Sequence, residues 1–152
     1  MNKVAICFGA AIVLGIAGSG LYKWNYDEWV AIPKARQPVQ SLMRDPASAQ
    51  FRNERIVSGG VLCGEVNSKN AMGGYVGYKK FISMGPSANY LEDHGRLEEA
   101  TTDEFIARMD EEIAIMKRFT KNQFEHPPKD QITQLAISNI FDKKWEELCG
   151  KA

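Results

Sequence analysis

The densest group of polar side chains in the sequence surrounds residues 63–70. The stretch reads Cys63-Gly64-Glu65-Val66-Asn67-Ser68-Lys69-Asn70, followed by Gly73-Gly74-Tyr75. A carboxylate, an amine and two amides at this spacing can bind a partner, and the glycines let its backbone come close. We therefore predict a binding site formed by Glu65, Asn67, Lys69, Asn70 and Tyr75.

An ordinary structural role explains the same residues. Asn67 and Asn70 can form hydrogen bonds with their own backbone in turns. Glu65 can pair with Arg52 or Lys79 on a neighbouring strand. Both interpretations stay open at the level of the sequence.

Catalytic chemistry has little support. Glu65 is the carboxylate best suited to act as a general base, with Tyr75 or Tyr78 near the substrate. The two histidines, His94 and His126, lack the close, repeated spacing of a metal site. The sequence contains neither a nucleophile elbow nor a phosphate-binding glycine loop. We predict a protein that is not an enzyme, with no catalytic residues, no metal and no cofactor.

Cys63 and Cys149 are the cysteines that follow the apolar N-terminal segment, which itself contains Cys7. An even number of cysteines outside the cytoplasm indicates a disulfide. Closing a loop of about 86 residues stabilises a fold by about 4 kcal/mol on the chain-entropy model. We predict a disulfide between Cys63 and Cys149.

Residues 4–21 form an apolar segment without a charged side chain. As a helix it rises roughly 27 Å, close to the roughly 30 Å hydrocarbon core of a bilayer. Lys3 supplies the positive end that stays in the cytoplasm. We expect residues 4–21 to contact the membrane and the remaining chain to be exported.

The segment 1–21 is either a retained membrane anchor or a cleaved signal peptide. Small residues ending at Ser19 fit a cleavage site. The aromatic juxtamembrane segment 22–32 favours an anchor, because aromatic side chains gather at the membrane interface. An anchored chain is expected in the bacterial inner membrane with its domain facing the periplasm. A chain cleaved near Ser19 is expected free in the periplasm.

The composition argues for one domain that does not bind nucleic acid. Lysine plus arginine and aspartate plus glutamate number 19 each, with the two signs interspersed. Nucleic-acid binding needs a concentrated positive face, which this balance does not provide. We expect residues 33–152 to form a single globular domain, since the roughly 130 residues that follow the apolar segment are a usual domain size.

Hydrophobic periodicity predicts an α+β domain. A helix begins at Pro33, a kinked helical continuation covers Asp45–Gln50, and two amphipathic helices begin at the Thr101 capping box and near Lys129. Between them we expect a small antiparallel sheet of about three strands. The expected strands are residues 55–57, 61–67 and 75–83, with a short edge strand at Tyr90–Leu91.

Each of the two C-terminal helices is expected to bury its apolar side. For the first helix that side is Phe105, Met109, Ile113 and Met116, with Ile106 and Phe119 beside them. For the second it is Ile132, Leu135, Ala136, Ile140, Phe141, Trp145 and Leu148.

Three short motifs of the sequence resemble those of a family of small exported proteins of bacteria and prophages. Their pattern is D-P-x-S-A-x-F-R, then C-G-E-V-N-x-K-N, then G-x-Y-x-G, and the resemblance covers about forty residues. The matching residues are Asp45, Pro46, Ser48, Ala49, Phe51, Arg52, Cys63, Gly64, Glu65, Asn67, Lys69, Asn70, Tyr75 and Gly77. The resemblance implies export, a turn from helix to sheet at the first motif, and a strand and loop at the second. It implies no activity.

The sequence thus predicts a non-catalytic protein of the cell envelope whose exported domain binds another protein or an envelope component. An immunity, inhibitory or phage-exclusion role would suit such a module. One alternative is an envelope hydrolase with Glu65 as general base. Another is a small subunit of a membrane-associated assembly, which an uncovered apolar face at Trp24 and Trp29 would favour.

Overall fold

The computed structural model describes residues 26–86, 88–120 and 127–150. The chain divides into two compact units, Met1–Lys34 and Ala35–Ala152. The predicted membrane segment 4–21 lies outside the described residues. Within the described residues no helix is both long and apolar enough to cross a membrane.

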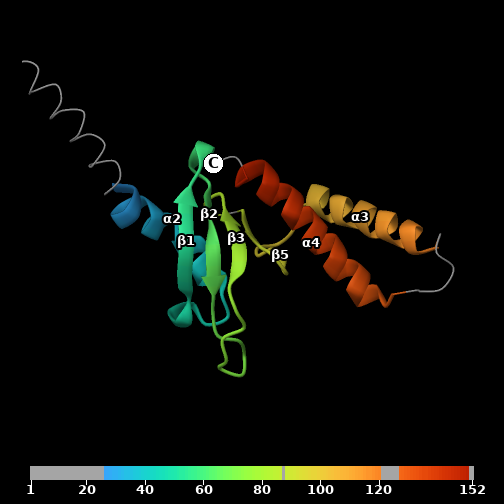
Figure 1. Cartoon of the computed structure of the whole chain (residues 1–152), viewed down its shortest axis with the longest axis horizontal. Coiled ribbons are helices and arrows are strands. Elements are labelled where there is room, and N and C mark those ends of the chain that lie inside the picture. The colour runs from blue at the N-terminus through green and yellow to red at the C-terminus, as the bar shows by residue number, and fades with distance from the viewer. Residues whose placement is uncertain (1–25, 87, 121–126, 151–152) are drawn as a thin grey trace, which may run out of the picture. The chain divides into compact units, whose positions relative to one another are not determined.

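The described elements are helices, short helical turns and strands (Figure 1). In chain order they are η1 (Asp27–Ala31), α2 (Ile32–Leu42), η2 (Pro46–Ser48), β1 (Gln50–Ile56), η3 (Ser58–Gly60), β2 (Leu62–Asn67), β3 (Lys79–Ser83), β4 (Asn89–Leu91), β5 (Gly95–Arg96), α3 (Thr102–Thr120) and α4 (Lys129–Leu148). This order confirms the prediction of a mixed α+β fold.

The strands form one antiparallel sheet in the order β1-β2-β3-β4-β5. The prediction of about three strands was therefore too low. Strand β5 has only two residues, Gly95 and Arg96, which is too short to show a period in sequence. Because β5 pairs with β4, the strand at Tyr90–Leu91 is not at the edge of the sheet.

The predicted strand over residues 75–83 is right only in its second half, where β3 begins at Lys79. Gly77 has a φ of 100°, which lies outside the range of strand residues. Asn67 also accepts a hydrogen bond from the Gly77 amide at 3.1 Å, so this amide is turned towards a side chain. The apolar and aromatic alternation of residues 75–78 therefore belongs to a loop.

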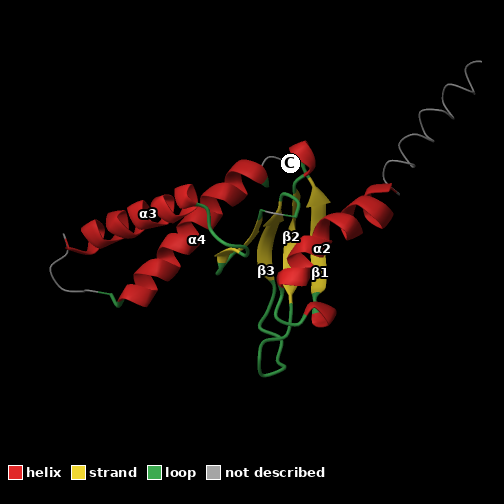
Figure 2. Ribbon diagram, turned by 180° about the vertical axis from the view of Figure 1, so that it is seen from behind, coloured by secondary structure: helices red, strands yellow, loops and turns green. Residues whose placement is uncertain are grey.

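Helix α2 lies against one face of the sheet (Figure 2). Its Val39 is fully buried, and the Ala35 carbonyl accepts a hydrogen bond from Ser83 Oγ at 3.1 Å. On the sheet below, Phe51 and Phe81 meet edge to face with ring centroids 5.6 Å apart. The Phe81 ring occupies the space above Gly64, where an added Cβ would lie 2.9 Å from Phe81 Cε1. This face is closed by aromatic packing that requires a glycine.

The opposite face of the sheet packs against the last turns of α4. The buried cluster there includes Cys63, Ile82 and Tyr90 of the sheet, with Phe141 and Cys149 from the C-terminal region. The predicted disulfide is confirmed: Cys63 and Cys149 are bonded, with their Cα atoms 6.0 Å apart. The bond joins β2 to the residue that follows α4, and it closes a covalent loop with a sequence separation of 86 residues.

Helices α3 and α4 lie side by side as an antiparallel pair (Figures 1 and 2). Helix α3 begins as predicted, because Thr101 and Glu104 form the reciprocal hydrogen bonds of a capping box, at 3.1 and 3.4 Å. The pair has a small apolar cluster of its own, formed by Ile115, Ile132 and Ala136.

The apolar side predicted to be buried in α3 is instead exposed. Five of its six members keep between 40% and 50% of their surface: Phe105 47%, Ile106 50%, Met109 44%, Ile113 40% and Met116 44%. The sixth, Phe119, is partly buried against the small cluster of the helix pair. In α4, Leu135 was also expected to be buried and is 39% exposed, whereas Ile132, Ala136 and Phe141 are buried as predicted. The reason is the polar contact between the helices, which turns α3 away from the orientation that its apolar side would favour.

Candidate binding surface

The loop between β2 and β3 is held in shape by Asn70. Its Oδ1 accepts hydrogen bonds from the amides of Met72 at 2.9 Å and Gly74 at 3.1 Å. The backbone amide of Asn70 donates a hydrogen bond to the Gly74 carbonyl at 2.9 Å. Gly73 completes the turn with a φ of 78°, a conformation that favours glycine. The side-chain oxygen of Asn70 therefore shapes the loop, as the structural interpretation of the sequence expected.

Asn67 has a similar role one step earlier in the chain. It is 8% exposed, and its Oδ1 accepts the hydrogen bond from the Gly77 amide. Burial and this bond leave Asn67 little surface for a partner. Two of the five predicted binding residues, Asn67 and Asn70, thus use their side-chain oxygens within the protein.

Lys69 and Tyr75 lie together at the surface of the loop. The Lys69 Nζ lies 5.6 Å from the centroid of the Tyr75 ring, and Tyr75 is 46% exposed. The backbone amide of Lys69 donates to Ser48 Oγ at 3.0 Å, and the Tyr75 hydroxyl donates to the Ser48 carbonyl at 3.3 Å. These bonds tie the loop to the turn after α2 and fix the two side chains in place.

Glu65 lies apart from Lys69 and Tyr75. Its neighbour Val66 lines the hollow beside the loop, and successive side chains of a strand point to opposite faces. Glu65 pairs with Arg52, whose guanidinium lies 3.8 Å from the centroid of the Tyr78 ring. The hydrogen bond from Arg52 lowers the pKa of the Glu65 carboxyl below its usual value of 4.5.

A hollow of about 580 Å³ opens beside Lys69 and Asn70, and we call it the loop hollow. Its walls come from the end of α2, the β2–β3 loop, β3 and the β4–β5 turn. Met43, Val66 and Leu91 give it apolar surface. This volume is within the range of sites that hold a small molecule or a few side chains of a partner.

The rim of the loop hollow is mostly basic. Arg44, Lys69 and Lys79 line it together with His94, and Asp93 is the one carboxylate among the described lining residues. Asp93 lies 3.2 Å from Lys79 Nζ and 2.9 Å from His94 Nδ1. Within the described chain Arg44 forms no ion pair, and it is exposed. Two positive charges, those of Arg44 and Lys69, are therefore left without a carboxylate partner at this rim.

Sequence reasoning missed Arg44, Lys79 and His94 as part of this surface. They are far apart along the chain, on the end of a helix, a strand and a turn, so no spacing rule connects them. The nearest signal was the loop itself, which supplied Lys69 and Asn70.

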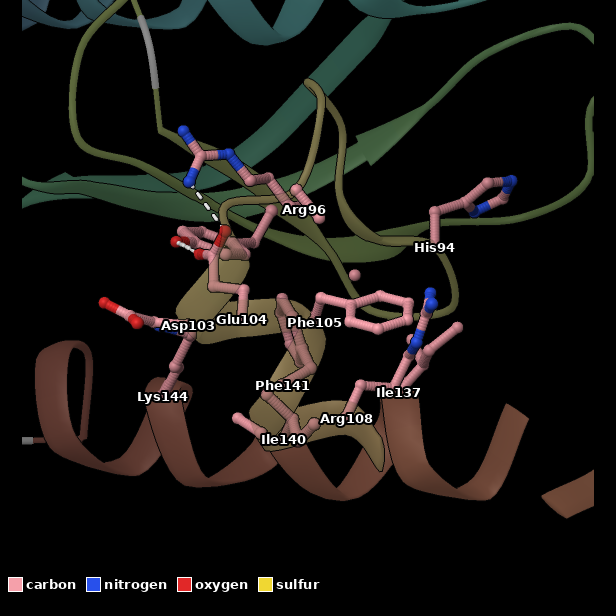
Figure 3. A pocket seen from close by; sticks show the side chains of 14 residues that line it. His94, Arg96, Asp103, Glu104, Phe105, Arg108, Ile137, Ile140, Phe141 and Lys144 are labelled. Atoms are coloured by element: carbon pink, nitrogen blue, oxygen red, sulfur yellow. Dashed lines mark hydrogen bonds and ion pairs between the residues drawn. The ribbon is translucent and has the colours of Figure 1, made fainter. Parts of the chain in front are cut away.

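A second, smaller cavity of about 240 Å³ lies where α3 and α4 meet the β4–β5 turn (Figure 3). Phe105 lines it from α3, and Ile137 and Ile140 line it from α4. His94 and Arg96 line it from the β4–β5 region. Its surface is mainly apolar.

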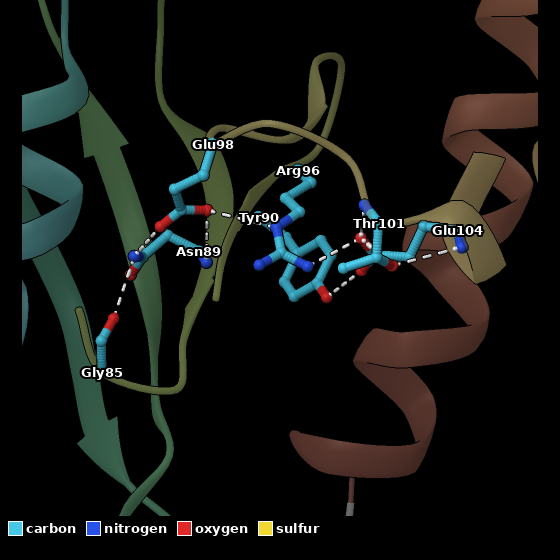
Figure 4. A network of polar contacts seen from close by, with 7 residues as sticks. All are labelled: Gly85, Asn89, Tyr90, Arg96, Glu98, Thr101 and Glu104. Carbon is cyan, nitrogen blue, oxygen red and sulfur yellow. Dashed lines mark hydrogen bonds and ion pairs between the residues drawn. The ribbon is translucent and has the colours of Figure 1, made fainter. Parts of the chain in front are cut away.

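A network of polar contacts beside this cavity joins the sheet to the helix pair (Figure 4). The Glu104 carboxylate accepts hydrogen bonds from the Tyr90 hydroxyl, from Arg96 Nη1 at 2.7 Å and from the Thr101 amide at 3.1 Å. Burial opposes ionisation, but these bonds outweigh it and lower the pKa of Glu104 to about 2. Burial, together with the hydrogen bond to Glu104, raises the pKa of Tyr90 to about 12. Glu104 thus stays ionised and Tyr90 stays neutral over a wide pH range.

Metal ligation has no support in the described part of the chain. Within it, no group of three or more His, Cys, Asp or Glu side chains is placed to hold a metal ion. His94 contacts Asp93 and keeps 66% of its side chain exposed, whereas His126 lies outside the described residues.

Comparison with known proteins gave no relatives. No protein-family model, no curated protein sequence and no solved structure matches this chain. The motif resemblance to small exported bacterial and prophage proteins therefore stays a prediction.

Proposed function

We propose that the chain is a non-catalytic binding protein of the bacterial envelope and that it takes its partner in the loop hollow. The observation that carries the proposal is the basic rim around an apolar floor. An acidic segment of another protein that also carries an apolar side chain would suit both parts of this surface. Two predicted binding residues, Lys69 and Asn70, line the hollow, and Tyr75 lies beside Lys69.

Two features support export of the domain. The Cys63–Cys149 disulfide is typical of proteins folded outside the cytoplasm. The apolar segment 4–21 suits either an anchor, with the domain in the periplasm, or a signal peptide cleaved near Ser19. We propose the anchored form, because the aromatic segment 22–32 follows directly.

The contacts of Glu65 do not favour the hydrolase alternative. A general base at neutral pH works best with a raised carboxyl pKa in a concave site. Glu65 has a lowered pKa, is held by Arg52 and does not line either cavity described above.

The alternative of a small subunit in a membrane assembly has one supporting observation. Trp29 is 79% exposed, and its neighbour Val30 is 46% exposed. Two apolar side chains with so much free surface suit a contact with lipid or another subunit. Trp24, the other residue on which this alternative rests, lies outside the described residues.

The test is photo-crosslinking in the envelope with a reactive amino acid at Val76, which lines the loop hollow. The full-length chain is expected to yield a defined crosslinked partner. The R44E/K69E variant should lose at least about 90% of it, because reversing two rim charges repels an acidic segment. The matched control R118E/K129E changes the same charges on the helix pair and should keep the crosslink. Equal crosslinking by both variants would overturn the proposal.

A further inference from the structure

Helix α3 carries an uncovered apolar stripe, which we define as Phe105, Ile106, Met109, Ile113 and Met116. Each of these side chains exposes at least 40% of its surface. The stripe shares no residue with the loop hollow. Large apolar side chains gathered on one helix face usually mark a contact with another macromolecule.

The stripe is free because another side of α3 faces α4, a side that carries Ile115 together with two polar side chains, Glu111 and Glu112. Glu111 accepts hydrogen bonds from Asn139 Nδ2 and Lys143 Nζ, both at 2.9 Å. Glu112 accepts one from Thr133 Oγ1 at 3.0 Å. These bonds set the rotation of α3 about its axis, and the stripe then points to one side of the helix pair.

The spacing of the stripe is that of a helix that packs along another helix. Ile106, Met109, Ile113 and Met116 follow one another at intervals of three, four and three residues. A repeat of this kind averages 3.5 residues and forms the seam between two coiled helices. Beside Phe105, the smaller cavity continues the apolar surface onto α4.

We propose that the stripe is a homodimer seam on which α3 of a second copy packs in the antiparallel direction. Ile106 then lies opposite Met116 of the second copy, and Met109 lies opposite Ile113 of the second copy. The same patch is used twice around a two-fold axis near Glu111. The contact is thus isologous and closed, as in most dimers.

Charge complementarity favours this occupant. The acidic residues of the first turn of α3 include Asp103, and the basic residues of its last turn include Lys117. Both side chains are exposed, and their separation of fourteen residues places them on the same side of the stripe along the helix. Asp103 also lines the edge of the smaller cavity. In the antiparallel dimer Asp103 lies beside Lys117 of the second copy, and the pair occurs twice. One surface therefore supplies both halves of its own ion pairs.

The direction of packing follows from two further observations. The first turn of α3 is bonded to the sheet through Glu104 and Tyr90, so parallel packing would bring both sheets to the same end of the seam. Antiparallel packing places them at opposite ends. It also sets the helix dipoles in opposite directions, which is the more favourable arrangement.

The seam contains one unfavourable contact. Asp110 continues the flank between Asp103 and Lys117 and meets Asp110 of the second copy close to the two-fold axis. Like charges at this distance oppose association. The dimer is therefore expected to be reversible.

The test is a charge exchange, with the full-length chain in mild detergent and its association measured by sedimentation equilibrium. The single variants D103K and K117D should each raise the dissociation constant about tenfold. The double variant D103K/K117D should restore it. Within one helix these residues are roughly 21 Å apart, so restoration cannot come from contact inside one chain.

Two controls complete the experiment. R118D alters the residue next to Lys117, points away from the stripe and should leave association unchanged. A mixture of D103K and K117D should form a heterodimer more tightly than either variant pairs with itself. Self-association through residues 4–21 would be equal in all variants and would not imitate this pattern.

Three results would overturn the proposal. The first is a wild-type chain that stays monomeric up to about 100 µM, far above the range of stable dimers. The second is a double variant whose dissociation constant is no lower than those of the two single variants. The third is an equal change of the dissociation constant in R118D and K117D. Failure of the loop-hollow experiment would leave these measurements unaffected, because the two surfaces share no residue.

Discussion

The sheet with its covering elements and the α3–α4 pair handle apolar side chains in opposite ways. In the sheet, Phe81, Leu62 and Ile82 are fully buried between α2 and the end of α4. In the helix pair, α3 turns its carboxylates towards α4 and leaves its apolar stripe uncovered. The sheet region thus buries its own apolar side chains, whereas the helix pair leaves apolar surface that further helices could cover. We infer from this difference that stability resides mainly in the sheet region, and that the helix pair contributes little to it and keeps an apolar surface free for a second copy.

Truncation of one apolar side chain in each region should have very different effects on the free energy of unfolding. Phe81→Ala removes a fully buried ring that packs on Phe51, and should lower the free energy of unfolding by about 3–5 kcal/mol. Ile113→Ala, at a position 40% exposed, should cost less than about 1 kcal/mol in dilute protein. Urea unfolding at micromolar concentration measures both. Similar losses in the two variants would contradict the division of roles.

Acid should weaken the polar network around Glu104, the joint between the sheet and the helix pair. The pKa of Glu104 is about 2 in the folded protein and 4.5 as its ordinary value, so its ionised form favours folding. The contribution is complete above pH 4.5 and is lost as the pH falls towards 2. It amounts to roughly 3 kcal/mol. Unfolding followed from pH 6 to pH 2 measures it.

The control for the acid experiment is a pair of glutamine variants. Glu104→Gln should flatten the pH dependence of stability between pH 4.5 and 2. The exposed Glu147→Gln should leave the slope as in the wild type. An unchanged slope in Glu104→Gln would show that the joint does not depend on this carboxylate.

Two glycines of the sheet region should differ in how well they tolerate an added methyl group. Gly64→Ala places a methyl group 2.9 Å from Phe81 Cε1 and should cost about 1–3 kcal/mol. Gly74→Ala has its nearest neighbour, Asn70 Oδ1, at an ordinary 3.8 Å and should change stability by less than about 0.5 kcal/mol. Thermal unfolding distinguishes them. A tolerated alanine at position 64 would mean that the aromatic layer can shift, against our account of a closed sheet region.

Much of the fold could be predicted because its signals are local. The start of α3 is encoded by Thr101 and Glu104, which lie three positions apart and form reciprocal hydrogen bonds. Strand β2 was recognised over nearly the same residues, with 61–67 predicted and Leu62–Asn67 observed. The extent of β3 was not predicted correctly. The Gly77 amide donates its hydrogen bond to the Asn67 side chain, ten positions earlier in the sequence, and so lies outside the strand.

The candidate site was predictable only in part. The polar loop pointed to Lys69, Asn70 and Tyr75. In the structure Lys69 and Tyr75 contact each other, whereas Asn70, although exposed, uses its side-chain oxygen to shape the loop. Arg44 and His94 belong to the same hollow through the folding of distant segments. Residue type alone does not distinguish an asparagine that binds a partner from one that caps its own turn.

Signals in the sequence were enough to predict the α+β class, the disulfide and the positions of the long helices. These follow from cysteine number, capping residues and periodicities that act within one or two turns of chain. Only the tertiary structure decided which side of α3 is exposed and which basic residues surround the loop hollow. The physical reason is that helix rotation and the meeting of distant segments depend on long-range bonds, here those of Glu111 and Glu112 to α4, that local spacing does not encode.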